Sequence, residues 1–102
     1  MKKKLAEFEE LSTFYKALAH PARLAIIQKF SVSETYKCSD FVRHLPFAQA
    51  TISEHLRKLA HAKLISVSKK GSSSEYRLNK EQFEKMKDQS SLHHFSTSPS
   101  KL

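Results

Sequence analysis

A proline between two amphipathic stretches constrains the fold of this chain more than any other residue. Because proline disfavours helical geometry in the residue before it, a helix that begins near Ser39 must end by Leu45, ahead of Pro46. After a turn of a few residues, apolar side chains recur at helical spacing, which predicts a second amphipathic helix over 49–62. The apolar residues of this helix are Ile52, Leu56 and Leu59. Two short helices joined by a tight turn are typical of a helix-turn-helix.

Alternating apolar and polar residues follow directly, over 64–79. The segments LISVSKK and EYRLN flank GSSS, which holds the only glycine of the chain, Gly71. This pattern predicts a two-stranded hairpin with a flexible tip that carries Lys69 and Lys70. A helix-turn-helix followed by such a hairpin, or wing, is a winged helix.

Three further helices complete the predicted fold. Apolar residues spaced three or four apart predict a helix over 5–18, and Pro21 suits the first turn of a second helix. The last helix follows Asn79, whose side chain can cap its first turn. We therefore expect a mainly α fold with a small β-hairpin and about five helices. One winged-helix domain for DNA binding and dimerisation is expected over 1–92, followed by a disordered tail over 93–102.

Three smaller features are also predicted. Residues 31–37 are polar and partly β-branched, which indicates a loop with at most a short strand. Lys2, Lys3 and Lys4 are expected to form a disordered basic arm. Leu24 is expected to be buried, since the apolar residues of the second helix go most of the way around it.

The charge of the chain is concentrated in the helix-turn-helix and wing. The net charge is +8, and residues 36–79 carry eight Lys and Arg against three Asp and Glu, which is five of the eight net charges. A basic patch on a folded domain favours a polyanionic partner such as double-stranded DNA. The alternative is that the surplus lysines only keep the protein soluble.

Several classes of protein are disfavoured by what the sequence lacks. Cys38 is the only cysteine, so no disulfide can form within the chain. No run of residues approaches the ~18 apolar residues of a membrane span, and the N-terminus lacks the apolar run of a signal peptide. No glycine-rich phosphate loop or nucleophile set beside a base is present, so we expect no enzyme and no cofactor. A cytoplasmic protein without membrane contact is expected.

The polar side of the 49–62 helix carries side chains suited to DNA. Gln49 and Ser53 lie one turn apart at the end that enters a major groove, where Gln can bond adenine through two hydrogen bonds. Thr51 and His55 lie one turn apart on a flanking strip. The remaining candidates, which can reach phosphates, are Arg57 and Lys58. Glu54 opposes phosphate binding unless it accepts from a cytosine or pairs with one of these cations. The alternative is a merely solvated helix face.

The wing offers a second set of cations. Lys69 and Lys70 precede its tip, and Arg77 lies on the returning strand. Such cations can contact the DNA backbone or a minor groove, which positions a protein without specifying sequence. An ordinary surface hairpin would have a similar sequence.

Two motifs of this chain resemble those of the ArsR-type winged-helix transcriptional repressors. FYKALAHPARLAIIQKF is similar to the family's first signature, in which Pro and then Arg-Leu open an Ile-rich helix. LPFAQATISEHLRKLAHAKLISVSKKGSSSEYRL resembles its recognition helix and wing. The resemblance covers about residues 8–79. It implies a homodimeric repressor on a near-palindromic operator. The base or phosphate contacts implied by position are Gln49, Thr51, Ser53 and His55.

The resemblance also implies a dimer joined through the first and last helices. The apolar stripe of the first helix is long and that of the last helix is short, so two copies together could cover apolar surface that one copy cannot. The residues expected at the interface are Leu5, Phe8, Leu11, Tyr15, Phe83 and Met86.

Two departures from the family pattern concern helix capping and metal sensing. Ala48 stands where the family usually has Ser, a loss of about 1 kcal/mol of capping. The family's Cys-x-Cys-Asp site reads Lys37, Ser39 and Asp40 around Cys38, and a single thiol cannot form it.

The family's other metal site, spaced Asp and His on the last helix, does not fit the adjacent pair His93 and His94 either. No metal is expected. Two alternatives stay open: a winged-helix module that binds another protein, and a repressor in which Cys38 is a redox switch.

Overall fold

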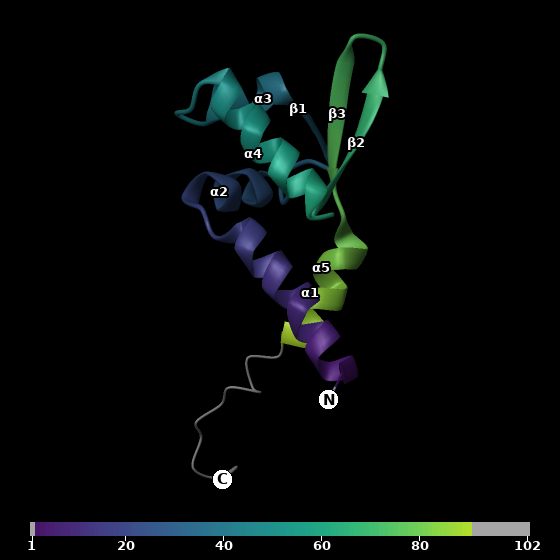
Figure 1. Ribbon diagram of the computed structural model, residues 1–102. Helices are drawn as coiled ribbons and strands as arrows, with labels where there is room; N and C mark the ends of the chain where they lie inside the picture. The colour runs from purple at the N-terminus through teal and green to yellow at the C-terminus, as the bar shows by residue number, and fades with distance from the viewer. Residues whose placement is uncertain (1, 91–102) are drawn as a thin grey trace.

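The computed structural model describes residues 2–90. These residues form five helices and a small antiparallel sheet (Figure 1). The elements are α1 (Lys2–Leu18), α2 (Pro21–Lys29), β1 (Thr35–Lys37), α3 (Cys38–His44), α4 (Gln49–His61), β2 (Ile65–Lys70), β3 (Ser73–Leu78) and α5 (Lys80–Ser90). The predicted mainly α winged helix is confirmed.

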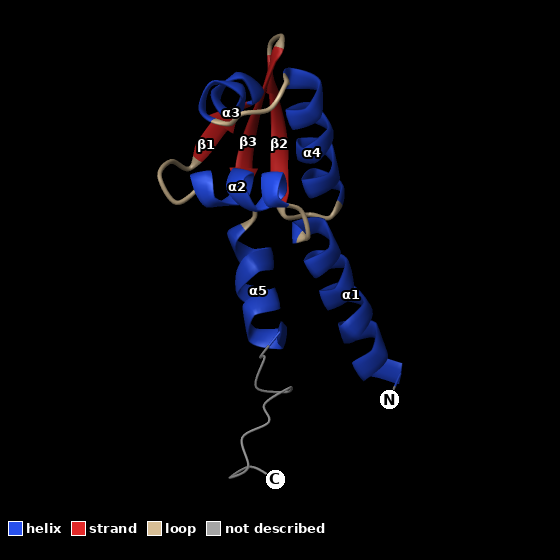
Figure 2. Cartoon of the chain, turned by 90° about the vertical axis from the view of Figure 1, so that its left-hand side faces the viewer, coloured by secondary structure: helices blue, strands red, loops and turns tan. Residues whose placement is uncertain are grey.

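The molecule consists of a body and a stalk. The body is formed by α2, α3, α4 and the sheet, whereas α1 and α5 project together from its lower side and form the stalk (Figures 1 and 2). The principal extents are 54 × 26 × 21 Å, and the radius of gyration is 16.0 Å. A compact domain of this length has a radius of gyration of about 13 Å, so the stalk makes the chain elongated.

The helix-turn-helix has the limits that Pro46 dictates. Helix α3 ends with Leu45 in an extended conformation at φ −121° and ψ 146°, as expected before proline. Helix α4 begins after Ala48, which provides no side-chain cap, also as expected. The three predicted apolar residues of α4 are completely buried, each worth roughly 1.5–3 kcal/mol of hydrophobic stabilisation. Helix α4 is thereby fixed on the core with its polar side outward.

The wing is a hairpin of β2 and β3 whose tip depends on Gly71. Its φ of +64° lies in the left-handed region, where a side chain would strain the backbone. The short strand allowed by the sequence is β1, which pairs with β3 and places Tyr36 opposite Tyr76. The Tyr36 hydroxyl donates to the Lys29 carbonyl at 2.8 Å, and its ring packs against Phe30 and Phe41. The wing is therefore tied to the core by an aromatic cluster.

Two side chains cap helices, of which the sequence predicts Asn79. The Asn79 Oδ1 atom accepts from the Gln82 backbone N–H at 3.2 Å, and its Nδ2 donates to the Lys63 carbonyl at 2.8 Å. At the start of α2, the His20 Nδ1 atom accepts from the Ala22 N–H at 3.0 Å. These caps fix the entry of α2 and α5.

Two sequence expectations are wrong. Helix α1 extends to Lys2, so the basic arm is helical, because lysine is a good helix former and nothing breaks the helix there. Leu24 is 53% exposed, since α2 turns it outward while Ala22 and Ile26 face the core. The predicted tail over 93–102, with its two histidines, lies outside the described residues.

Candidate nucleic-acid interface

Helix α4 exposes most of the predicted base- and phosphate-contacting side chains. Gln49, Thr51, Ser53, Arg57 and Lys58 are all exposed, on the side of α4 away from the core. Ser53 lies beside the start of α3, with its Oγ 3.5 Å from the Cys38 Sγ. Helix α4 is therefore held on the core by its buried apolar face. Its outer face carries polar side chains long enough to reach base edges.

Glu54 has a partner in Arg57. The guanidinium donates twice to the carboxylate, from Nε to Oε2 at 3.1 Å and from Nη2 to Oε1 at 2.6 Å. This hydrogen bonding lowers the pKa of Glu54 and raises the pKa of Arg57, so both stay charged. Of the two roles that the sequence left open for Glu54, the structure shows the pair with Arg57.

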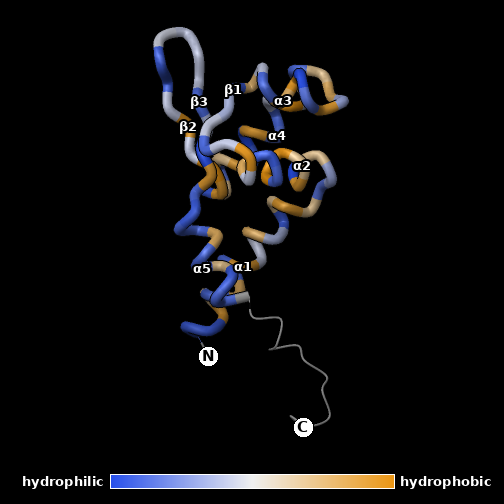
Figure 3. Tube along the Cα trace, turned by 180° about the vertical axis from the view of Figure 1, so that it is seen from behind, coloured by the Kyte–Doolittle hydropathy of each residue, from blue (hydrophilic) through white to orange (hydrophobic). Residues whose placement is uncertain are grey.

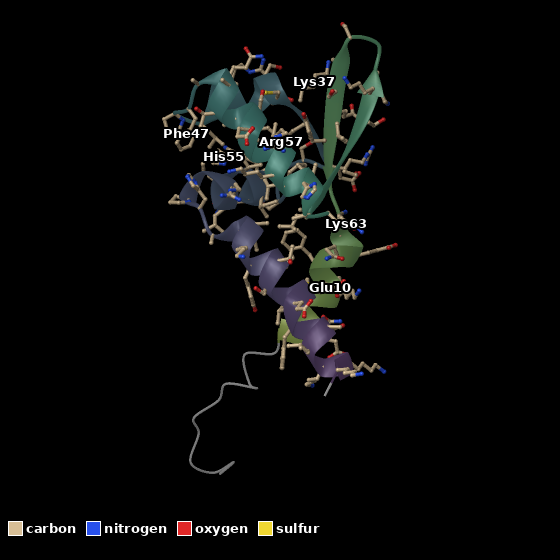
Figure 4. The ribbon with its side chains drawn as sticks, viewed as in Figure 1. Glu10, Lys37, Phe47, His55, Arg57 and Lys63 are labelled. Atoms are coloured by element: carbon tan, nitrogen blue, oxygen red, sulfur yellow. The ribbon has the colours of Figure 1, made fainter. Side chains whose placement is uncertain are left out.

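His55 does not lie on the exposed face. Its side chain is 8% exposed and lies between α4 and α2, with its ring centroid 4.4 Å from that of His20, whereas Arg57 lies on another side of α4 (Figure 4). Burial, followed by the charges of His20, Arg23 and Lys58, lowers the pKa of His55. The expectation that His55 contacts DNA therefore needs correction: its side chain packs within the protein.

The wing presents two of its three cations near the tip. Lys69 and Lys70 are exposed at the end of β2, and the whole tip is hydrophilic to neutral in Figure 3. Lys70 Nζ is 3.9 Å from Glu75 Oε1, a contact too long and exposed to fix it. Arg77 lies nearer the base of the hairpin, where its Nη1 is 3.8 Å from Glu34 Oε2. Alternation with Tyr76, which packs on the core, places Arg77 on the outer face of the sheet. Arg77 is thus not gathered with the wing tip.

The stalk exposes only part of the predicted dimer residues. Three of its apolar side chains are exposed, Leu5 by 54%, Phe8 by 44% and Tyr15 by 42%. Phe83 is partly buried against Phe14, with ring centroids 5.1 Å apart. Two residues placed at the interface by the sequence belong to the core of the single chain instead: Leu11 and Met86. The packing of α5 against α1 buries them, which sequence periodicity on separate helices could not show.

Basic residues outside the predicted set gather on the flank of α4. Lys16 of α1, Arg23 of α2, and His61 of α4 line a pocket together with Arg57 and Lys58. Sequence reasoning missed Lys16, Arg23 and His61 because they come from three helices. Over residues 2–90 no three His, Cys, Asp or Glu side chains are grouped to hold a metal ion. None of the helices in this range is long and apolar enough to cross a membrane.

A clamped helix with an exposed polar face, preceded by a tight turn and followed by a basic hairpin, defines a winged-helix DNA-binding protein. Residues 20–67 match the model of the bacterial regulatory protein, arsR family. The chain is 38% identical over 74 residues to an arsenical resistance operon repressor from Staphylococcus xylosus, covering 72% of this chain and 70% of that protein. The repressor of the same name from Staphylococcus aureus is 36% identical over 72 residues, covering 71% and 68%. The chain belongs to the arsR family and is a DNA-binding transcriptional regulator.

Solved structures have the same fold. An ArsR-like transcriptional regulator from Rhodococcus sp. RHA1 superposes with a TM-score of 0.73 at 23% identity, covering 86% of this chain and 80% of that chain. The transcriptional repressor PagR of Bacillus anthracis gives a TM-score of 0.64 at 25% identity, covering 85% and 97%.

Proposed function

We propose that the chain represses transcription as a homodimer that binds a near-palindromic operator. The observation that carries this proposal is the exposed polar face of α4 beside a lysine-tipped wing. The relatives named as repressors support the direction of regulation. Repression follows physically if the operator overlaps a promoter, because the bound dimer then occupies DNA that the polymerase needs. Such a regulator works in the cytoplasm, where the DNA is.

In this proposal the first turns of α4, its later turns and the wing have different roles in DNA binding. Gln49, Thr51 and Ser53 lie in the first turns of α4 and contact bases, whereas Lys58 in its later turns contacts phosphates. Arg57, also in the later turns, contacts a phosphate once it is released from Glu54. In the wing, Lys69 and Lys70 contact the DNA backbone. Arg77 lies farther from the tip, and its exposed 3.8 Å contact with Glu34 is too weak to hold it, so it adds general attraction to the DNA.

The dimer would be formed by the exposed stripe of the stalk. Leu5, Phe8 and Tyr15 leave apolar surface uncovered on a stalk that projects away from the body (Figure 2). Large exposed apolar patches mark interaction surfaces. A second copy packed there would place two α4 helices on one duplex, which is why the operator is expected to be near-palindromic.

Selection of bound fragments from genomic DNA tests this function and supplies the operator at once. Ser53→Ala or Gln49→Ala should then relax base preference, whereas Lys70→Ala should weaken all sequences alike. Lys29→Ala, on the C-terminal turn of α2 outside the proposed interface, is the matched control for Lys70→Ala. Equal losses on operator and random DNA for all of the interface variants would refute the assigned roles.

A further inference from the structure

A pocket of about 440 Å³ lies where three helices meet on the flank of α4. Five of its six lining residues are basic, and they come from the last turn of α1, the first turn of α2 and the second half of α4. The lining residues are Lys16, Ala17, Arg23, Arg57, Lys58 and His61.

The positive charge in this pocket is largely uncompensated. Arg57 is paired with Glu54. Over residues 2–90, in contrast, Lys16, Arg23 and Lys58 form no ion pair with any carboxylate. Glu54 attracts Lys58 electrostatically but is hydrogen-bonded to Arg57, so it offsets only part of the charge of the pocket. The cations that converge here repel one another, and a bound anion would stabilise their arrangement.

Helix dipoles account for two of these cations but not for Arg23. Lys16 and Lys58 lie in the last turns of α1 and α4, where the negative end of each dipole favours a cation. Arg23 lies in the first turn of α2, at the positive end of its dipole, where a cation is disfavoured. The place of Arg23 is therefore explained by neither a carboxylate nor its own helix.

The guanidinium of Arg23 also has an unused donor. Its Nε is buried and has no hydrogen-bond partner among residues 2–90. An arginine fork matches the oxygens of a phosphate group through two parallel hydrogen bonds. Within the described part of the chain, the Nδ1 atom of the nearby His55 is likewise buried without a hydrogen-bond partner. Arg23 thus contributes to the lining of the pocket a positive charge and a guanidinium that is not fully hydrogen-bonded.

We propose that this pocket binds an oxyanion of the phosphate class, with Arg23 as its principal donor and Lys16 and Lys58 beside it. The oxyanion is a free ion or ligand group, or a backbone phosphate of the bound duplex. The second source rests on the proposed docking of α4, whereas the first does not depend on DNA.

Occupation of the pocket has a measurable effect on His55. The charges of Arg23 and Lys58 contribute to the lowered pKa of this residue. A bound anion offsets both charges, so the pKa of His55 should rise when the pocket is filled. This readout reports on the pocket itself, separately from any effect on DNA affinity.

The first arm of the test titrates inorganic phosphate into the full chain without DNA, at constant ionic strength held with chloride. Saturable shifts of the His55 and His61 ring resonances and a rise in the pKa of His55 are expected from a free oxyanion. Arg23→Gln and Lys58→Gln should each weaken this binding at least tenfold. Lys29→Gln, which removes the same charge at the other end of α2, should leave it unchanged.

The second arm measures duplex affinity against salt for the same variants. If the oxyanion is a DNA phosphate, Arg23→Gln and Lys58→Gln each make the slope shallower by about 0.9, and Lys29→Gln does not. Because Lys58 is exposed, Lys58→Gln should fold normally. If Arg23→Gln fails to fold, the salt slope of Lys58→Gln tests the proposal instead. No saturable phosphate binding together with slopes equal to that of Lys29→Gln would overturn the proposal. If the unchanged protein showed no preference for the operator over random DNA, this would contradict the proposed function and not the oxyanion site.

Discussion

The pairing of Glu54 with Arg57 predicts that Glu54→Gln will strengthen DNA binding. Arg57 donates two hydrogen bonds to the carboxylate, at 3.1 and 2.6 Å, and these bonds lower the pKa of Glu54. The ionised carboxylate repels phosphates and occupies the guanidinium. Glutamine removes the charge and loosens the pair, which frees Arg57 to bind one phosphate.

The magnitude follows from counterion release. One additional phosphate contact steepens the dependence of log affinity on log salt by about 0.9. Between 50 and 200 mM salt, the Glu54→Gln variant should therefore lose about 3.5-fold more affinity than the unchanged protein. The gain at low salt should appear on every duplex, since a phosphate contact carries no sequence information.

Fluorescence anisotropy on operator and random duplexes over a series of salt concentrations measures this slope. Glu84→Gln, which makes the same charge change on α5, is the matched control and should leave the slope unchanged. Adding Arg57→Gln to Glu54→Gln should return the slope to its original value. Weaker binding restricted to the operator, with an unchanged slope, would refute the reasoning and indicate that Glu54 accepts from a base.

Three further outcomes are expected. Phe8→Glu together with Leu5→Glu should give a monomer by light scattering at micromolar concentration, and a monomer in the unchanged protein would contradict the proposed dimer. Because His55 has a lowered pKa, its stabilisation is complete above about pH 6.5 and is lost as pH falls toward the folded-state value. Urea unfolding followed by circular dichroism should show that the free energy of unfolding falls on acidification, and that it falls less in His55→Gln than in the unchanged protein. Equal declines in the two proteins would contradict this role of His55. If Cys38 is a redox switch, its oxidation should disturb Ser53, which lies 3.5 Å from it, so peroxide should change operator affinity in the unchanged protein and not in Cys38→Ser. An unchanged affinity in both would exclude the switch.

Features that depend on a few neighbouring residues could be predicted from the sequence. Pro46 ends α3, Gly71 supplies the left-handed residue of the hairpin tip, and Asn79 caps α5. Each is a local effect of backbone geometry or of one hydrogen bond, so it does not depend on how the rest of the chain packs. The candidate face of α4 was predictable for the same reason, since helical spacing alone separates Ile52 from Ser53.

The spacing of His55 in the sequence already indicates that it is buried. It lies three residues after Ile52 and four before Leu59, so its spacing already placed it at the edge of the apolar face. Its polar character favoured the opposite interpretation. Only the approach of His20, the N-cap residue of α2, shows that this edge is covered.

The sequence by itself determined the order of the helices and strands, the Asn79 cap, the turns and the polar face of α4, because these follow from residues close together in the chain. The tertiary structure alone decided that Leu11 and Met86 are buried within one chain while Leu5 and Phe8 are not. It also brought Arg23 beside cations of α1 and α4. Burial and charge clustering depend on which elements meet in space, and the distances involved are set by packing between helices remote in sequence.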